Sequence, residues 1–279
     1  MKKKIYPKDM YVESNGLRLH YLDWGNRGAD TLVLLHGLQD CSRSWDFLAS
    51  VMSRKYHVLA LDHRGHGDSD WSDSNHYRLV DYVSDIEALV DQENLNDMVL
   101  IGHSAGGRNA FMYASENISK IKALVIADID PDGFNLESQL MFRKYNSESD
   151  NWNSLELVIE RLRARQPISS DDMLHHQALY MTKQDASGVF VWKRDRKLLD
   201  NYERPDLWNY WSQIECPTLI IRGRQSKLLT HEVGVRMLES VVQGRLVELE
   251  GGGHWFYQEA PEAFENSVRW FLESLIFKK

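Results

Sequence analysis

A serine between two glycines is the residue of this chain best placed to do chemistry. Ser104 lies in the run Gly102-His-Ser-Ala-Gly106, directly after the apolar residues 99–101. A buried strand that enters so tight a turn forces the central residue into a strained backbone conformation and exposes its side chain. The pattern predicts Ser104 as a nucleophile and the amide of Ala105, at a helix start, as an oxyanion donor.

A serine hydroxyl is a weak nucleophile until a base removes its proton and an acid orients that base. His254 follows the three glycines 251–253, which come after the strand-like residues 245–249 and before a helical pattern over 261–275. Ordering three successive glycines costs conformational entropy, which indicates that this loop needs a backbone conformation that other residues disfavour. We therefore predict His254 as the general base.

Two further loops follow apolar, strand-like runs. Residues 31–35 lead into His36-Gly37, and the amide of Leu38 is placed to be the second oxyanion donor. Residues 58–61 lead into the run D-H-R-G-H-G-D-S at 62–69.

With these four motifs in this order, the chain resembles the α/β-hydrolase family, in the branch of esterases, lactonases and carbon–carbon bond hydrolases. The resemblance covers residues 11–134 and 213–277. It implies an α/β-hydrolase fold, with a mostly parallel eight-stranded sheet flanked by helices. It also implies a helical cap inserted after the sixth strand, so we assign residues 1–134 and 213–279 to the core and 135–212 to the cap.

The hydrophobic pattern agrees with this fold class. Apolar runs that alternate with helical stretches indicate a parallel sheet covered on both faces. Residues 135–212 show no convincing buried strand, and their helical stretches near 155–165 and 171–182 are polar. Such a cap would shape the substrate pocket and exclude water from it.

The acid of the triad has two candidate positions. Many members of the family carry it after the seventh strand, where this chain has Ser226 and Lys227. Others carry it after the sixth strand, where this chain has Asp128 and Asp130. We predict Asp128, because it ends the apolar run, while Asp130 precedes a proline and belongs to the turn. Ser226 then becomes a hydrogen-bonding helper near the histidine.

Other polar residues receive supporting roles. His36, His103 and Trp255 are expected to border the substrate site, with His36 supporting the oxyanion loop and His103 packing beside the nucleophile. Asp62 and its neighbours are expected to brace the loop after the fourth strand. The adjacent histidines at 175–176 point about 100° apart on a helix and have no third metal ligand.

Composition limits the partners. The chain has 279 residues, 43% of them hydrophobic, and a formal net charge of −8, which argues against nucleic acid or an anionic membrane as a partner. No apolar segment follows the basic N-terminal residues, and Cys41 and Cys216 form no disulfide or metal pattern. We expect a cytoplasmic protein with a small-molecule substrate, possible homodimerisation, and no cofactor or metal.

The resulting hypothesis is a serine hydrolase that cleaves a small-to-medium ester, lactone or thioester through an acyl-enzyme. Carbon–carbon bond hydrolysis on the same triad is an alternative, although the family members with that chemistry favour a small polar residue where this chain has His103. A weakly catalytic binding protein on a hydrolase scaffold is a third. Epoxide hydrolysis and dehalogenation fit poorly, because those branches use an aspartate where this chain has Ser104.

Overall fold

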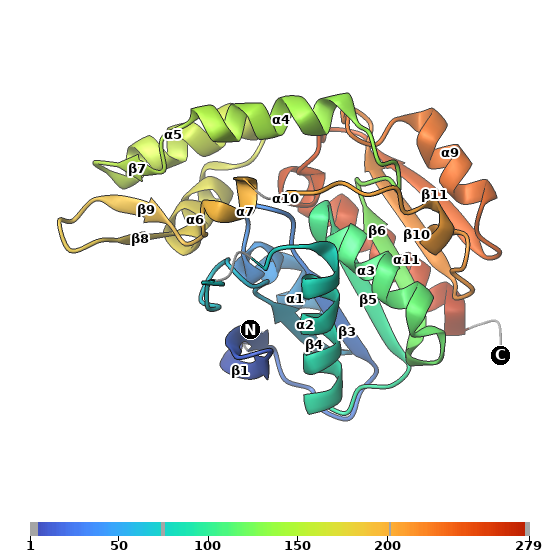
Figure 1. The fold of residues 1–279 in the computed structure, drawn as a ribbon. Coiled ribbons are helices and arrows are strands. Elements are labelled where there is room, and N and C mark those ends of the chain that lie inside the picture. The colour runs from blue at the N-terminus through green and yellow to red at the C-terminus, as the bar shows by residue number, and fades with distance from the viewer. Residues whose placement is uncertain (1–4, 74–75, 201, 277–279) are drawn as a thin grey trace.

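The computed structural model describes residues 5–73, 76–200 and 202–276 and is organised around one large sheet (Figure 1). The strands follow the spatial order β1-β2-β4-β3-β5-β6-β10-β11. Their bounds are β1 (Lys8–Ser14), β2 (Leu17–Asp23), β3 (Thr31–Leu35), β4 (His57–Leu61), β5 (Met98–His103), β6 (Ile121–Ala127), β10 (Thr218–Gly223) and β11 (Gly244–Leu249). Only the pairs β1–β2 and β2–β4 are antiparallel, which confirms the predicted mostly parallel sheet of eight strands.

Helices cover both faces of this sheet. Their bounds are α1 (Asp46–Met52), α2 (Leu79–Gln92), α3 (Ala105–Glu116), α9 (His231–Glu239), α10 (Phe256–Glu259) and α11 (Pro261–Ile276), with 3₁₀ turns at Ser42–Trp45 and Ile118–Lys120. Strand residues alternate between two apolar clusters, because successive side chains point to opposite faces. In β3, Val33 packs in the cluster under α2 and α3, and Leu34 packs in the cluster under α1 and α11.

The insertion after β6 is a mixture of helices and strands. Its elements are α4 (Leu136–Ser147), β7 (Asn151–Trp152), α5 (Leu155–Arg165), α6 (Asp171–Met181), β8 (Thr182–Gln184), β9 (Phe190–Trp192), α7 (Lys197–Asp200) and α8 (Trp208–Trp211). The predicted cap insertion after the sixth strand is present, and it holds, besides its helices, a small antiparallel sheet of β7, β9 and β8 that the sequence did not predict. These strands are two or three residues long and only partly buried, so they leave no apolar run in the sequence.

The two ends of the insertion pack differently. Helices α5 and α6 bury Val158 and Leu174 in a separate apolar cluster that touches the core at Cys41. The last helix, α8, instead packs on α3, where Trp211 meets the ring of Phe111 edge-on at 5.5 Å. The part of the insertion that stands apart from the core therefore ends before α8.

In Figure 1 the insertion, coloured from green to orange, extends along one end of the core. Parallel strands present their carboxyl ends at one edge of a sheet, and the loops after β3, β5, β6, β10 and β11 meet there. None of the described helices is long and apolar enough to cross a membrane.

Candidate active site

Ser104 lies at the sharp turn between β5 and α3. Its backbone has φ of 52° and ψ of −124°, a conformation that non-glycine residues rarely adopt. The flanking glycines make this turn possible: a Cβ atom on Gly102 would lie 2.4 Å from the carbonyl oxygen of Gly106, and one on Gly106 would lie 2.4 Å from that of Leu35. The turn holds the hydroxyl above the sheet, as the sequence pattern predicted.

His254 connects Ser104 with Asp128. Its Nε2 lies 3.0 Å from the Oγ of Ser104, and its Nδ1 lies 2.8 Å from Oδ2 of Asp128. When Nδ1–H donates to the carboxylate, Nε2 is left with a free lone pair directed at the hydroxyl. This is the hydrogen-bond pattern of a nucleophile, its base and the acid that orients the base.

Asp128 is fully buried and is held by groups from the loop after β10. The hydroxyl of Ser226 donates to its Oδ2, and the amide of Gly223 donates to its Oδ1 at 3.2 Å. Burial raises the pKa of Asp128 well above its ordinary value, while these two hydrogen bonds favour the charged form. Ser226 therefore acts on the acid itself and has no hydrogen bond to His254 among those of the described residues.

Asp130 lies away from the histidine. Its carboxylate accepts hydrogen bonds from Nη2 of Arg204 at 2.6 Å and from Nδ2 of Asn135 at 2.9 Å. Asp128 has φ of 51°, so the chain turns sharply there and the two carboxylates no longer point to the same side. Of the two candidate acids, the structure brings Asp128 to the imidazole.

The environment of His254 favours the neutral imidazole. Burial, together with the positive charges of Arg165 and Arg204, lowers its pKa to about 3. Only the neutral ring can accept the proton of Ser104, so the resting site contains the base in its active form.

The two backbone amides predicted to bind an oxyanion, those of Leu38 and Ala105, have no acceptor in the backbone hydrogen bonds of the described residues. Ala105 is the first residue of α3, so its N–H has no acceptor within the helix. The amide of Leu38 takes part in none of the loop hydrogen bonds found among the described residues. Both residues line the same cavity, beside Ser104.

Two of the residues predicted to border the substrate are held by hydrogen bonds within the protein, although Nδ1 of His103 has no partner among the described residues. His36 is buried; its Nδ1 donates to the carbonyl of Gly37 at 2.8 Å, and its Nε2 accepts from the amide of His63 at 3.0 Å. His103 is also buried, and its Nε2 donates to the carbonyl of His254 at 2.8 Å. These contacts support the oxyanion loop and the histidine loop rather than a ligand.

Trp255 is placed differently from these two histidines. Its ring meets that of His254 edge-on at 4.9 Å and lies 4.8 Å from the guanidinium carbon of Arg165, which comes from α5 of the insertion. The side chain is partly exposed, so it stays a candidate for contact with substrate.

The loop after β4 is braced by its charged residues. Asp62 accepts hydrogen bonds from the amides of Ser42 at 2.6 Å and Asp68 at 3.1 Å. Arg64 forms a buried pair with Asp85, with Nε donating to Oδ2 at 2.6 Å. Both arrangements hold the loop against neighbouring elements and leave these residues away from Ser104.

The same loop contributes two members of the one group of potential metal ligands found in the described residues, and β2 contributes the third. His20, Asp62 and Asp68 present ligand atoms within 4.8 Å of one another. Nδ1 of His20 is already paired with Oδ2 of Asp62 at 2.7 Å, and both oxygens of Asp62 accept backbone hydrogens. The group therefore works as an internal hydrogen-bond network.

Sequence reasoning missed two residues that line the cavity beside the oxyanion amides, His63 and Asn109. His63 follows the last residues of a parallel strand, and Asn109 lies one helical turn after Ala105. Both positions face the edge of the sheet where ligands bind, and this placement is the signal that could have identified them.

Comparisons with known proteins agree with this fold. The sequence profile described as alpha/beta hydrolase fold matches residues 30–261. A putative esterase/lipase of Haemophilus influenzae is 25% identical over 248 residues, covering 86% of this chain and 82% of that protein. Epoxide hydrolase 1 of Caenorhabditis elegans is 25% identical over 289 residues, covering 94% of this chain and 69% of that protein.

Among solved structures, E-2-(acetamidomethylene)succinate hydrolase superposes with a TM-score of 0.88 at 21% identity, covering 96% of this chain and 100% of that chain. The profile match spans most of the sequence and includes the nucleophile turn and the histidine loop. The chain belongs to the alpha/beta hydrolase fold family.

Proposed function

We propose that the protein is a serine hydrolase that cleaves a carboxylic ester, lactone or thioester of small to medium size. The observation that carries the proposal is the continuous hydrogen-bond path from Ser104 through His254 to Asp128, at 3.0 and 2.8 Å. The amides of Leu38 and Ala105 beside the nucleophile add support, because acyl transfer builds negative charge on a carbonyl oxygen.

In the first half of the reaction, Oγ of Ser104 attacks the carbonyl carbon while Nε2 of His254 accepts the hydroxyl proton. The carbonyl π electrons move to oxygen, and the amides of Leu38 and Ala105 donate hydrogen bonds to that oxyanion. Asp128 stabilises the imidazolium that forms. When the tetrahedral intermediate collapses, the bond to the leaving oxygen or sulfur breaks and His254 returns the proton to it.

In the second half, a water molecule takes the place of the leaving group. His254 removes one of its protons, and the resulting hydroxide adds to the acyl carbon of the ester on Ser104. Collapse of the second intermediate releases the carboxylic acid and returns the proton to Ser104. The triad and water balance the reaction without a further reactant.

The identity of the nucleophile separates this proposal from epoxide opening, although one relative is named an epoxide hydrolase. Attack by Ser104 on an epoxide carbon would leave an ether on the enzyme. Water activated by a histidine does not cleave an ether, whereas it does cleave an acyl ester. A serine at this position therefore supports acyl transfer.

The proposal is tested with 4-nitrophenyl acetate and butyrate, comparing the wild type with Ser104→Ala and His254→Gln. We expect both variants to lose activity by at least about a thousandfold, because members of a triad act as a unit. A fluorophosphonate probe should add its mass to Ser104 in the wild type alone. Equal activity in wild type and Ser104→Ala would remove Ser104 as the nucleophile.

Absence of both labelling and turnover in the wild type would instead favour a binding protein on this scaffold. Labelling without ester turnover would direct the search toward carbon–carbon bonds.

A further inference from the structure

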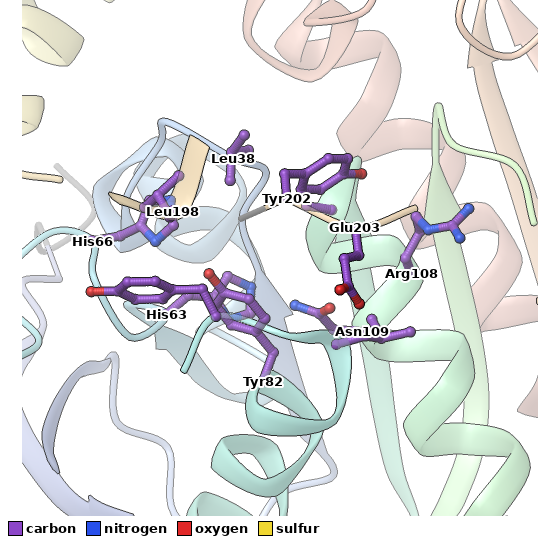
Figure 2. A pocket seen from close by; sticks show the side chains of 12 residues that line it. Leu38, His63, His66, Tyr82, Arg108, Asn109, Leu198, Tyr202 and Glu203 are labelled. Atoms are coloured by element: carbon purple, nitrogen blue, oxygen red, sulfur yellow. The ribbon is translucent and has the colours of Figure 1, made fainter. Parts of the chain in front are cut away.

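A small cavity opens beside the two oxyanion amides (Figure 2). Leu38 lines it from the loop after β3, Ala105 from the start of α3, and Leu198 and Tyr202 from the insertion. It holds about 30 Å³, room for one or two groups of the size of water. The cavity thus adjoins the position where a bound carbonyl would lie.

Asn109 directs an unpaired amide into this cavity. The residue is 3% exposed and lies four positions after Ala105, on the same face of α3. None of the hydrogen bonds found among the described residues involves its side-chain amide, which borders the cavity. Figure 2 shows the amide pointing toward the space between His63 and Tyr82.

His63 is the second polar side chain without a partner. It is 2% exposed, and neither ring nitrogen has a hydrogen-bond partner among the described residues. Burial lowers the pKa of His63 well below its ordinary value, so the ring is neutral and offers one donor and one acceptor. The buried ring nitrogens of His63 lack partners, and the amide of Asn109 borders the same cavity; a polar ligand group in that cavity would pair with both.

The charges around the cavity select a neutral ligand group. Arg108 lines the wall, but its guanidinium donates to the carbonyl of Asp130 at 2.7 Å and to that of Pro205. Glu203, from the insertion, brings an exposed carboxylate to the rim above Asn109. A substrate anion would meet this carboxylate and a neutral histidine, whereas a hydroxyl or carbonyl group can pair with both amide and imidazole.

The cavity takes the acyl side of the substrate. His254 must reach the leaving group to protonate it, and neither His254 nor Trp255 lines this space. The leaving group therefore lies on the histidine side of Ser104, and the acyl chain extends past the oxyanion amides.

From these contacts, and resting on the proposed function, we infer that the substrate carries a short acyl chain with a neutral hydroxyl or carbonyl group. Asn109 and His63 bind that group in the cavity. An unsubstituted alkyl chain that enters the cavity leaves the amide of Asn109 and the imidazole of His63 without a hydrogen-bond partner. A site built in this way rejects the analogue that lacks the polar group.

The test compares two pairs of esters with matched leaving groups in the wild type. One pair is 4-nitrophenyl 3-hydroxybutyrate, as separate enantiomers, against the butyrate. The other is the 4-oxopentanoate against the pentanoate. We expect kcat/KM for at least one polar ester to exceed that of its alkyl partner by about tenfold or more. Equal values in both pairs overturn the inference and leave the serine hydrolase proposal intact.

Asn109→Leu keeps the size of the side chain and removes its hydrogen bonds, so it should abolish the preference for the polar ester. Asn266→Leu, on the exposed face of α11, is the matched control and should retain the preference. If Asn109→Leu does not fold by circular dichroism, His63→Phe, which keeps a ring and removes its hydrogen bonds, takes its place. A preference that persists in a folded variant overturns the assignment of these residues.

If the wild type hydrolyses none of these esters, the proposed ester cleavage fails, and binding then tests the inference separately. Ser104→Ala is titrated calorimetrically with 3-hydroxybutyrate and with butyrate. Tighter binding of the hydroxy acid supports the cavity assignment, and equal binding contradicts it.

Discussion

The hydroxyl of Ser226 donates a hydrogen bond to Oδ2 of Asp128, across 98 positions of sequence. The same oxygen faces Nδ1 of His254. The loop after β6 supplies the charge, and the loop after β10 supplies a donor that stabilises it. Both loops thus meet at the same carboxylate, although only one of them carries an acid.

Substituting Ser226→Ala should lower kcat without a comparable change in KM. The buried carboxylate of Asp128 loses one donor, and a hydrogen bond to a charged group contributes about 1.5–3 kcal/mol, roughly ten- to a hundredfold in rate. Steady-state kinetics with a 4-nitrophenyl ester measures the effect. Ser226→Thr keeps the hydroxyl and should recover most of the activity; an Ala variant as active as wild type would remove this role.

Asp128→Asn should reduce kcat by about 10⁴, because the amide no longer selects the tautomer that leaves Nε2 free. Asp130→Asn provides the matched comparison, since that carboxylate pairs with Arg204 instead, and it should stay within about tenfold of wild type. Adding Ser226→Asp to Asp128→Asn should restore part of the activity, because Ser226 already adjoins the acid's position. If Asp130→Asn were the more damaging of the two, the acid assignment would be reversed.

The acid limb of the pH profile should lie well below pH 6. Activity requires neutral His254, so kcat/KM falls as the pH decreases through its pKa, which burial and Arg165 lower to about 3. Arg165→Gln removes a positive charge and should move the limb to higher pH. Arg163→Gln, on the same helix and exposed, is the control. An unshifted limb in Arg165→Gln would show that this charge does not act on the base.

Ser104→Gly should stabilise the protein while it abolishes activity. The positive φ of Ser104 strains a residue that has a Cβ atom, and glycine relieves this strain, which is about 1–3 kcal/mol. Glycine also increases the conformational entropy of the unfolded chain, which offsets part of this gain in stability. We expect a net gain of about 1 kcal/mol in urea unfolding. Ser104→Ala keeps the Cβ and should show no such gain; equal stability of the two variants would argue against strain.

Much of the fold could be predicted because its strands are buried on both faces and leave continuous apolar runs. The nucleophile turn and the histidine loop could be predicted for a related reason. Close backbone approach demands glycine, as at Gly106, where a Cβ atom would collide with the backbone of β3. Ser104 and His254 could be selected from the sequence because these steric requirements leave glycines next to them.

The choice of acid was less certain from sequence, because strand alternation places Asp128 and Asp130 on the same side. The left-handed turn at Asp128 separates them, and such a turn at an aspartate has no strong sequence signature. The small sheet of the insertion escaped prediction because its strands are short and half-exposed. Asn109 and His63 look ordinary in sequence, since a missing hydrogen-bond partner is a property of the folded chain.

Ser104, Asp128 and His254 come from distant positions in the chain. Their side chains meet only at the edge of a completed sheet. A nascent chain whose His254 is still inside the ribosome therefore lacks the general base that Ser104 needs. During refolding, secondary structure should return before any hydrolysis does. Recovery of catalysis would then report the pairing of β11 with β10, which brings the loop of His254 to Ser104.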